Sequence, residues 1–170
     1  TLRRLKLESV GLRSACEQDA EYFKVFDQVV DLHKEDCAQA YLWVEEIVRI
    51  AQDSRCEMIH PGWGFLSENV QFAEKVKEAG LKLIGPRPET VRDFGQKHIA
   101  RELAEAAGVP LLPGSGLIQE TQTALDFCDR YGFPVIVKST AGGGGVGMRV
   151  CYDAGELEAT IEQIRTVAAT

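Results

Sequence analysis

Lysine and glycine residues in the stretch KSTAGGGGVGMRV, residues 138–150, have the types and spacing to bind phosphate. Glycine loses more conformational freedom on folding than any other residue, so four in a row indicate a functional constraint. Backbone N–H groups that no side chain covers can close over phosphate oxygens and donate hydrogen bonds to them. Lys138 ends the preceding apolar segment, and its ammonium group supplies a compact positive charge. The predicted polyphosphate contacts are Lys138, Gly142, Gly143, Gly144, Gly145 and Gly147.

Three other readings of this stretch fit the sequence less well. A flexible linker is longer and carries more polar residues. Gly142, Gly144 and Gly147 match the dinucleotide pattern G-x-G-x-x-G, but that motif must open a helix, and here the strand-like MRVCY follows. A Walker A loop needs lysine directly after its last glycine, where this chain has Met148. The glycines are therefore predicted to join two strands and to form a hairpin lid.

Short apolar segments alternate with helical patterns over the first half of the chain. Apolar residues at helical spacing predict helices over 40–53 and from about 67 to 79, the second closed by Gly80 as its C-cap. The predicted strands cover 9–14, 28–32, 57–60 and 81–85. Strand–helix–strand alternation predicts a parallel sheet with helices on its faces, which is a three-layer α/β domain.

The sequence PRP at 86–88 marks a change of pattern. Thr90 and Asp93 have capping-box-like spacing for a short helix, and Asp153 and Glu156 have it for the last helix. The other predicted elements are helices over 96–107 and 121–132 and strands over 133–139 and 147–152. We therefore predict two domains, residues 1–86 and the first part of an α+β domain at 87–170.

Composition narrows the classes of partner. The formal net charge is −7, with 45% hydrophobic and 26% charged residues, and the basic residues are scattered. Without a basic stripe, nucleic-acid binding has no support, and no apolar run reaches the roughly 18 residues of a membrane span. The chain also starts without an apolar secretory core. The five cysteines show no CxxC spacing, which argues against zinc and against a disulfide framework. They favour a reducing compartment, the cytoplasm or alternatively the mitochondrial matrix.

Three segments together resemble the biotin carboxylases, a family of the ATP-grasp superfamily. FPVIVKSTAGGGGVGMRV is similar to their lysine strand and glycine lid, and IHPGWGFLSEN (59–69) to the signature of the domain before it, with Trp63 where tyrosine is usual. FGQKHIARELAEAAGVPLLPG (94–114) resembles the segment with a second nucleotide-binding lysine, here Lys97. Taken alone, Lys97 reads as an exposed helix lysine. The combination KSTAGGGGVGM is most like urea carboxylase, although Val146 replaces the cation common in the lid.

The resemblance implies a pre-ATP-grasp domain followed by the start of an ATP-grasp domain. In this family ATP phosphorylates bicarbonate, and the carboxyphosphate then carboxylates N1′ of biotin on a separate domain. Lys97 and Lys138 would hold the phosphates of ATP. The Mg²⁺ ligands and catalytic residues would follow residue 170, and the first strand would precede Thr1, so no catalytic or metal residue is expected in this chain. The piece alone is expected to be inactive, its partners being ATP, bicarbonate and a biotin carrier domain, with a homodimer for the full-length enzyme.

The carboxyl acceptor is left open between urea, which would give allophanate, and an acyl-CoA or pyruvate. An ATP-grasp enzyme outside the biotin group, such as carbamoyl phosphate synthetase, fits HPGWGFLSEN and the four-glycine lid less well. A reading from another class is a non-catalytic remnant that binds nucleotide or a protein partner.

Overall fold

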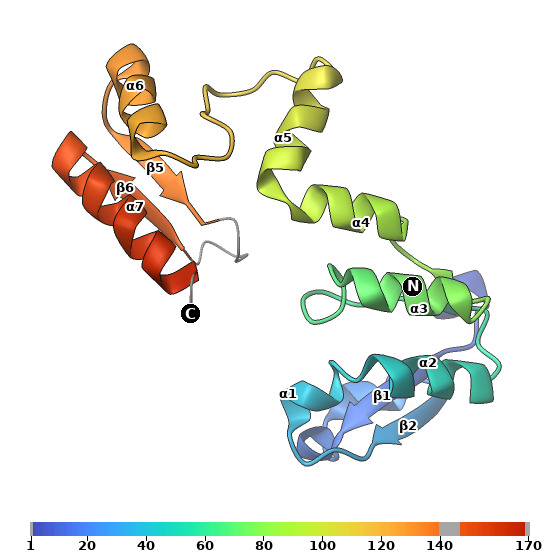
Figure 1. Ribbon diagram of the computed structural model, residues 1–170. Coiled ribbons are helices and arrows are strands. Elements are labelled where there is room, and N and C mark those ends of the chain that lie inside the picture. Colours follow the sequence, from blue (N-terminus) through green and yellow to red (C-terminus); the bar gives the residue numbers. More distant parts are fainter. Residues whose placement is uncertain (1, 140–146, 169–170) are drawn as a thin grey trace. The chain divides into compact units, whose positions relative to one another are not determined.

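The computed structural model describes residues 2–139 and 147–168, and the chain divides into two compact units, Thr1–Arg92 and Asp93–Thr170 (Figure 1). The first unit alternates strands and helices with parallel strand pairing, and the second contains an antiparallel hairpin with helices. Both features agree with the α/β class and the α+β start that the sequence predicts. The domain boundary at residue 86 stays a prediction.

Two parallel strand pairs form the sheet structure of the first unit. β1 pairs with β2 from Val10↔Gln28 to Ser14↔Leu32, and β3 pairs with β4. The strands are β1 (Val10–Ser14), β2 (Gln28–Leu32), β3 (Met58–Ile59) and β4 (Lys82–Leu83). Short 3₁₀ helices occupy Leu2–Leu5, Ala15–Glu17 and Glu21–Val25. The parallel pairing confirms the prediction made from the alternation of elements.

Helices α2 (Val44–Asp53) and α3 (Val70–Glu78) supply most of the core of the first unit. The spacing of Val44, Ile47 and Val48 puts their side chains on one face of α2, and all three are buried. They pack in one cluster with Phe72 of α3, which is only 1% exposed. Ala79 is the C-cap of α3, and Gly80, predicted as the C-cap, lies one residue further on. Its φ of +73° is a left-handed conformation that glycine adopts without a steric penalty, so the glycine does close the helix.

Two helix starts differ from the sequence expectation. The helix expected over 40–53 is split, because the separate helix α1 (Cys37–Ala40) precedes it and α2 begins only at Val44. The carboxylate of Asp36 caps α1 by accepting the N–H groups of Ala38 and Gln39 at 2.9 and 3.2 Å. The short helix expected to start near Thr90 begins instead at Pro88, as α4 (Pro88–Gly95). Proline suits a first helical turn because its missing N–H would have no partner there.

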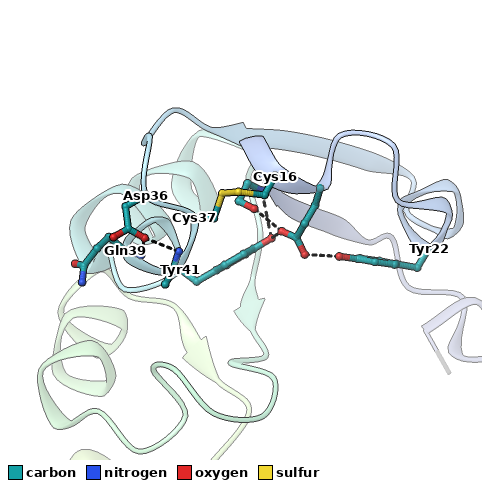
Figure 2. The surroundings of a disulfide bond; sticks show 9 residues. Cys16, Tyr22, Asp36, Cys37, Gln39 and Tyr41 are labelled. Carbon is teal, nitrogen blue, oxygen red and sulfur yellow. Dashed lines mark hydrogen bonds between the residues drawn. A yellow bond between two sulfur atoms is a disulfide. The ribbon is translucent and has the colours of Figure 1, made fainter.

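A disulfide joins Cys16 to Cys37, which corrects the expectation that the cysteines form none (Figure 2). The reason lies in the strand pairing. Because β1 and β2 are parallel, the segments that follow them start at the same edge, and the two Cα atoms come within 6.2 Å. Their sequence separation of 21 hides this proximity from a search for local cysteine motifs. Cysteine usage therefore gives no argument for a reducing compartment. Closing a loop of this size stabilises a fold by about 3 kcal/mol in the chain-entropy model.

Glu17, next to the disulfide, gathers three hydroxyl groups around its carboxylate. Ser14 Oγ donates to it at 2.5 Å, and the hydroxyls of Tyr22 and Tyr41 also donate to it. Partial burial raises the pKa of Glu17, but these hydrogen bonds outweigh burial and lower the pKa to about 2. Burial and the bond to Glu17 raise the pKa of Tyr41 to about 12. The carboxylate therefore connects the segment after β1 to Tyr41, the residue that directly follows α1.

In the second unit, two helices pack against one face of a hairpin. The hairpin pairs β5 (Val135–Lys138) with β6 (Met148–Cys151) in antiparallel register, and α6 (Thr121–Tyr131) and α7 (Ala154–Ala168) complete this core (Figure 1). The predicted cap of the last helix is confirmed, because Asp153 Oδ1 accepts the N–H of Glu156 at 2.9 Å. Helix α5 (Lys97–Ala106) also belongs to this unit.

Across residues 2–139 and 147–168, we find no helix with the length and apolar character needed to cross a membrane.

The hydrogen bonds around Glu17 predict a pH-dependent stability. Its pKa in the folded state lies below the ordinary 4.5, so the ionised carboxylate stabilises the fold above pH 4.5 and this contribution disappears as the pH falls toward 2. We expect Glu17→Gln to lower the free energy of unfolding at neutral pH, and this deficit to shrink below pH 4.5. Urea titrations followed by tryptophan fluorescence measure it, because both tryptophans lie in the first unit.

The matched control is Glu8→Gln, which removes an exposed carboxylate of the same unit. Its unfolding free energy should run parallel to that of the wild type. A deficit for Glu17→Gln that stays constant with pH would show that the charge of Glu17 does not contribute.

Candidate functional site

The predicted glycine lid connects the two strands of the β5–β6 hairpin. Lys138 pairs with Met148, and the next hydrogen bond runs from the N–H of Ser139 to the carbonyl oxygen of Gly147 at 2.9 Å. The connection therefore leads from strand to strand, which excludes the dinucleotide fingerprint and confirms the expected hairpin. Gly147 has φ +79°, in the left-handed region.

Four of the predicted phosphate contacts lie outside the described residues. These are Gly142, Gly143, Gly144 and Gly145, and the same applies to Val146. Their contact with phosphate stays a prediction. Of the predicted contacts, the structure describes Lys97, Lys138 and Gly147.

Burial of one face of β5 fixes the side on which Lys138 lies. Val135 and Val137 pack against the core formed with α6 and α7. Side chains alternate along a strand, so Ile136 and Lys138 lie on the opposite, open face. Both are exposed, Ile136 by 57%. The pairing register puts Met148 opposite Lys138, and Met148 is 49% exposed.

Lys97 reaches the same end of the hairpin from the start of helix α5. Its Nζ donates a hydrogen bond to the carbonyl oxygen of Ser139 at 3.1 Å, across a sequence separation of 42 residues. Ser139 directly follows Lys138, so the structure brings the two predicted lysines to one end of one hairpin.

Arg101 shares the face of α5 with Lys97, because the two are four residues apart. Its Nη2 donates to the carbonyl oxygen of Leu112 at 2.6 Å and so fixes the extended segment after α5. Sequence reasoning missed Arg101, although the spacing K-x-x-x-R contains the signal. It also missed Ile136 and Met148, which the strand alternation around Lys138 would have shown. Among the described residues, no group of three or more histidine, cysteine or acidic side chains could hold a metal ion.

Comparison with known protein families identifies the family of this chain. Residues 1–91 match the biotin carboxylase N-terminal domain, which is more than half of the chain. The chain belongs to the biotin carboxylase family. Residues 96–170 match the ATP-binding domain of the carbamoyl-phosphate synthase L chain, as expected for the start of an ATP-grasp domain.

Individual relatives agree with this family. The chain is 41% identical over 165 residues to urea amidolyase of Lachancea kluyveri, covering 97% of this chain and 9% of that protein. It is 39% identical over 170 residues to the chloroplastic biotin carboxylase of Arabidopsis thaliana, covering 99% of this chain and 32% of that protein. The chain therefore spans about a third of the biotin carboxylase and about a tenth of the urea amidolyase.

Solved structures show the same fold. Biotin carboxylase of Campylobacter jejuni, in complex with β-γ-ATP, superposes with a TM-score of 0.90 at 32% identity, over 97% of this chain and 37% of that one. The biotin carboxylase domain dimer of 2-oxoglutarate carboxylase from Hydrogenobacter thermophilus, in complex with MgADP, ADP and bicarbonate, gives 0.87 at 34% identity. It covers 96% of this chain and 36% of that one. The three-layer domain and the ATP-grasp start expected from the sequence are thus confirmed.

The left-handed backbone of Gly147 predicts that a side chain there weakens the hairpin. We expect Gly147→Ala to cost about 1–2 kcal/mol, the usual penalty of this conformation for L-residues. Amide hydrogen exchange in β5 and β6 should then be roughly 5- to 30-fold faster.

Gly95→Ala is the control, because Gly95 ends α4 without a positive φ and an added Cβ would meet no atom within 4 Å. In the Gly95→Ala variant, the amide hydrogens of β5 and β6 should exchange at the wild-type rate. Unchanged protection in Gly147→Ala would contradict the assigned turn geometry.

Proposed function

We propose that this chain is the nucleotide-binding part of a biotin carboxylase, which uses ATP and bicarbonate to carboxylate biotin, and that Lys97 and Lys138 bind the phosphates of ATP. The observation that carries the proposal is the bond from Lys97 Nζ to the carbonyl oxygen of Ser139 at 3.1 Å. This bond holds the ammonium of Lys97, at the start of α5, beside the end of β5, where Lys138 lies.

The charge at this end of the hairpin suits a polyphosphate. The chain has a formal net charge of −7, and yet Lys97 and Lys138 both lie at the end of the hairpin where the glycine connection begins. Hydrogen bonds between an ammonium and a phosphate oxygen are charge-assisted, and they are about twice as strong as neutral ones. The backbone N–H groups of residues 142–147 would add donors without adding side-chain bulk.

The open face of the hairpin suits a purine base beside these cations. Ile136 and Met148 expose apolar surface next to Lys138. Ligand sites combine such apolar surface with a few placed polar groups. We assign the base to Ile136 and Met148 and the phosphates to the lysine end.

The chemistry needs the transferred phosphoryl group to be held in line and its charge neutralised. In the proposed role, Lys97 and Lys138 orient the triphosphate and offset its charge while bicarbonate attacks the terminal phosphorus and ADP leaves. The carboxyphosphate formed would supply the carboxyl group for N1′ of biotin, with release of phosphate and of the proton on N1′. The glycine connection would exclude water from the nucleotide, because water otherwise competes with bicarbonate for the phosphoryl group.

The described residues do not fit the metal of the reaction. Mg²⁺ prefers carboxylate oxygens, and the described part of the chain gathers no such group. We therefore assign none of the described residues to Mg²⁺.

The proposed lysine contacts can be tested through nucleotide affinity. Lys97→Ala and Lys138→Ala should each weaken ATP binding to the chain roughly 10- to 100-fold, because a hydrogen bond to a charged group contributes about 1.5–3 kcal/mol. Isothermal titration calorimetry measures the dissociation constants. Lys82→Ala removes an exposed strand lysine of the first unit and should bind ATP like the wild type. Equal affinity in all four proteins, or no binding to the wild type, would contradict the assignment.

We further propose urea as the carboxyl acceptor of the enzyme that contains this chain. The lid sequence KSTAGGGGVGM supports urea over acyl-CoA and pyruvate, and so does the 41% identity to a urea amidolyase over 97% of the chain. Pyruvate carboxylases also resemble the chain, with 45% identity over 130 residues for that of Aspergillus niger. The acceptor therefore needs a direct test.

Acceptor-dependent ATP hydrolysis separates the candidates. In the carboxylase that contains this chain, supplied with bicarbonate and carrying biotin, we expect urea to stimulate phosphate release, and acetyl-CoA and pyruvate to leave it unchanged. Detection of allophanate by mass spectrometry would complete the assignment. Stimulation by pyruvate or acetyl-CoA alone would show that the acceptor is not urea and would leave the ATP site unaffected.

A further inference from the structure

The Cys16–Cys37 pair is held together by the backbone and not by the disulfide alone. Parallel pairing of β1 with β2 extends to Ser14↔Leu32, and the two cysteines follow in the segments that leave this edge. Their Cα atoms are 6.2 Å apart, within the range that a disulfide bridges without backbone movement. Strand pairing would keep the thiols close after reduction, so the bond can form again.

The pair is also accessible. Cys16 is exposed and Cys37 is half-buried, so a thiol from solvent can approach the sulfur of Cys16. Of the other cysteines, Cys128 and Cys151 are buried, and Cys56 is half-buried like Cys37 but forms no disulfide. Thiol–disulfide exchange depends on such access of the attacking thiolate to a sulfur of the bond.

Helix α1 links the disulfide to a distant loop. Cys37 is the first residue of α1, and Tyr41 directly follows its last. The hydroxyl of Tyr41 donates to Glu17, the neighbour of Cys16, and its ring lies 5.5 Å from the ring of Phe65 between centroids. Figure 2 shows Tyr41 beside the disulfide.

Phe65 belongs to the loop 60–66, whose backbone is unusual. Phe65 has φ +42°, and Gly62 and Gly64 also have positive φ. A non-glycine residue in this region needs support from its surroundings. Tyr41 supplies part of that support to Phe65, and Leu66 anchors the end of the loop in the core, where it is 5% exposed.

We propose that Cys16 and Cys37 form a reversible exchange site for small thiols of the glutathione class, and that its redox state sets the order of the loop 60–66. A thiolate attacks Sγ of Cys16 and forms a mixed disulfide, while Cys37 leaves as a thiolate and takes a proton. A second thiol then releases Cys16. One protein disulfide and two thiols thus become two protein thiols and one small-molecule disulfide. The site does not depend on the proposed carboxylase activity.

The test incubates the native 170-residue chain in glutathione buffers, oxidised or reduced, and traps free thiols with iodoacetamide for mass spectrometry. Of the five cysteines, three should be alkylated after oxidation and five after reduction, when the trapped protein is unfolded for alkylation. Hydrogen exchange on the same two samples should show severalfold faster exchange in peptides that cover 37–47 and 60–69 after reduction. Peptides of β5 and β6 should not change.

Variants separate the bond from its consequence. In both glutathione buffers, Cys37→Ser should show the hydrogen exchange of the reduced wild type. Cys56→Ser, the matched control, should show the same change in hydrogen exchange between the two buffers as the wild type. Phe65→Leu should keep the redox response of 37–47 and lose that of 60–69. The wild-type measurements stand even where a variant does not fold.

Three results would overturn the proposal. The first is alkylation of all five cysteines after incubation in oxidised glutathione. The second is a disulfide that reduced glutathione opens only in denaturant. The third is complete reduction without faster exchange in residues 60–69.

Discussion

The hydrogen bond from the ammonium of Lys97 to the carbonyl oxygen of Ser139 organises the candidate site. It joins the start of helix α5 to the residue that follows strand β5, and the two bonded residues are 42 positions apart in the sequence. The ammonium of Lys97 therefore lies next to Ser139, the residue that follows Lys138, where the glycine connection begins.

The second constraint is burial of one face of the hairpin. Val135 and Val137 must pack against α6 and α7, because these apolar side chains form part of the core of the unit. The period of two along a strand then forces Ile136 and Lys138 onto the open face. The packing that stabilises the unit thus orients the residues that we assign to the nucleotide. One face of β5 packs against the core, and the opposite face carries the proposed nucleotide contacts.

Local patterns in the sequence predicted much of this fold. The strand over 28–32 was predicted with its observed bounds. The Asp153 cap of α7 and the glycine turn that closes α3 at Gly80 were also predicted, since each depends on neighbouring residues alone. Contacts over long separations were not predictable in this way. The Cys16–Cys37 disulfide depends on the pairing of β1 with β2, and the Lys97 contact depends on how α5 meets β5. Lys138 was predicted from its position directly before the glycine stretch, whereas Lys97 was found through family resemblance. The four-glycine run lies outside the described residues, so its phosphate contacts stay a prediction.

The most direct test is a lysine-resolved NMR titration with ATP on the chain reductively methylated with ¹³C. Each dimethylated lysine gives its own signal, and assignment by single Lys→Arg variants identifies Lys97 and Lys138. The account predicts that ATP shifts these two signals at the same concentrations and leaves those of first-unit lysines such as Lys75 in place. Shifts confined to lysines of the first unit, with Lys97 and Lys138 unchanged at saturating ATP, would contradict it.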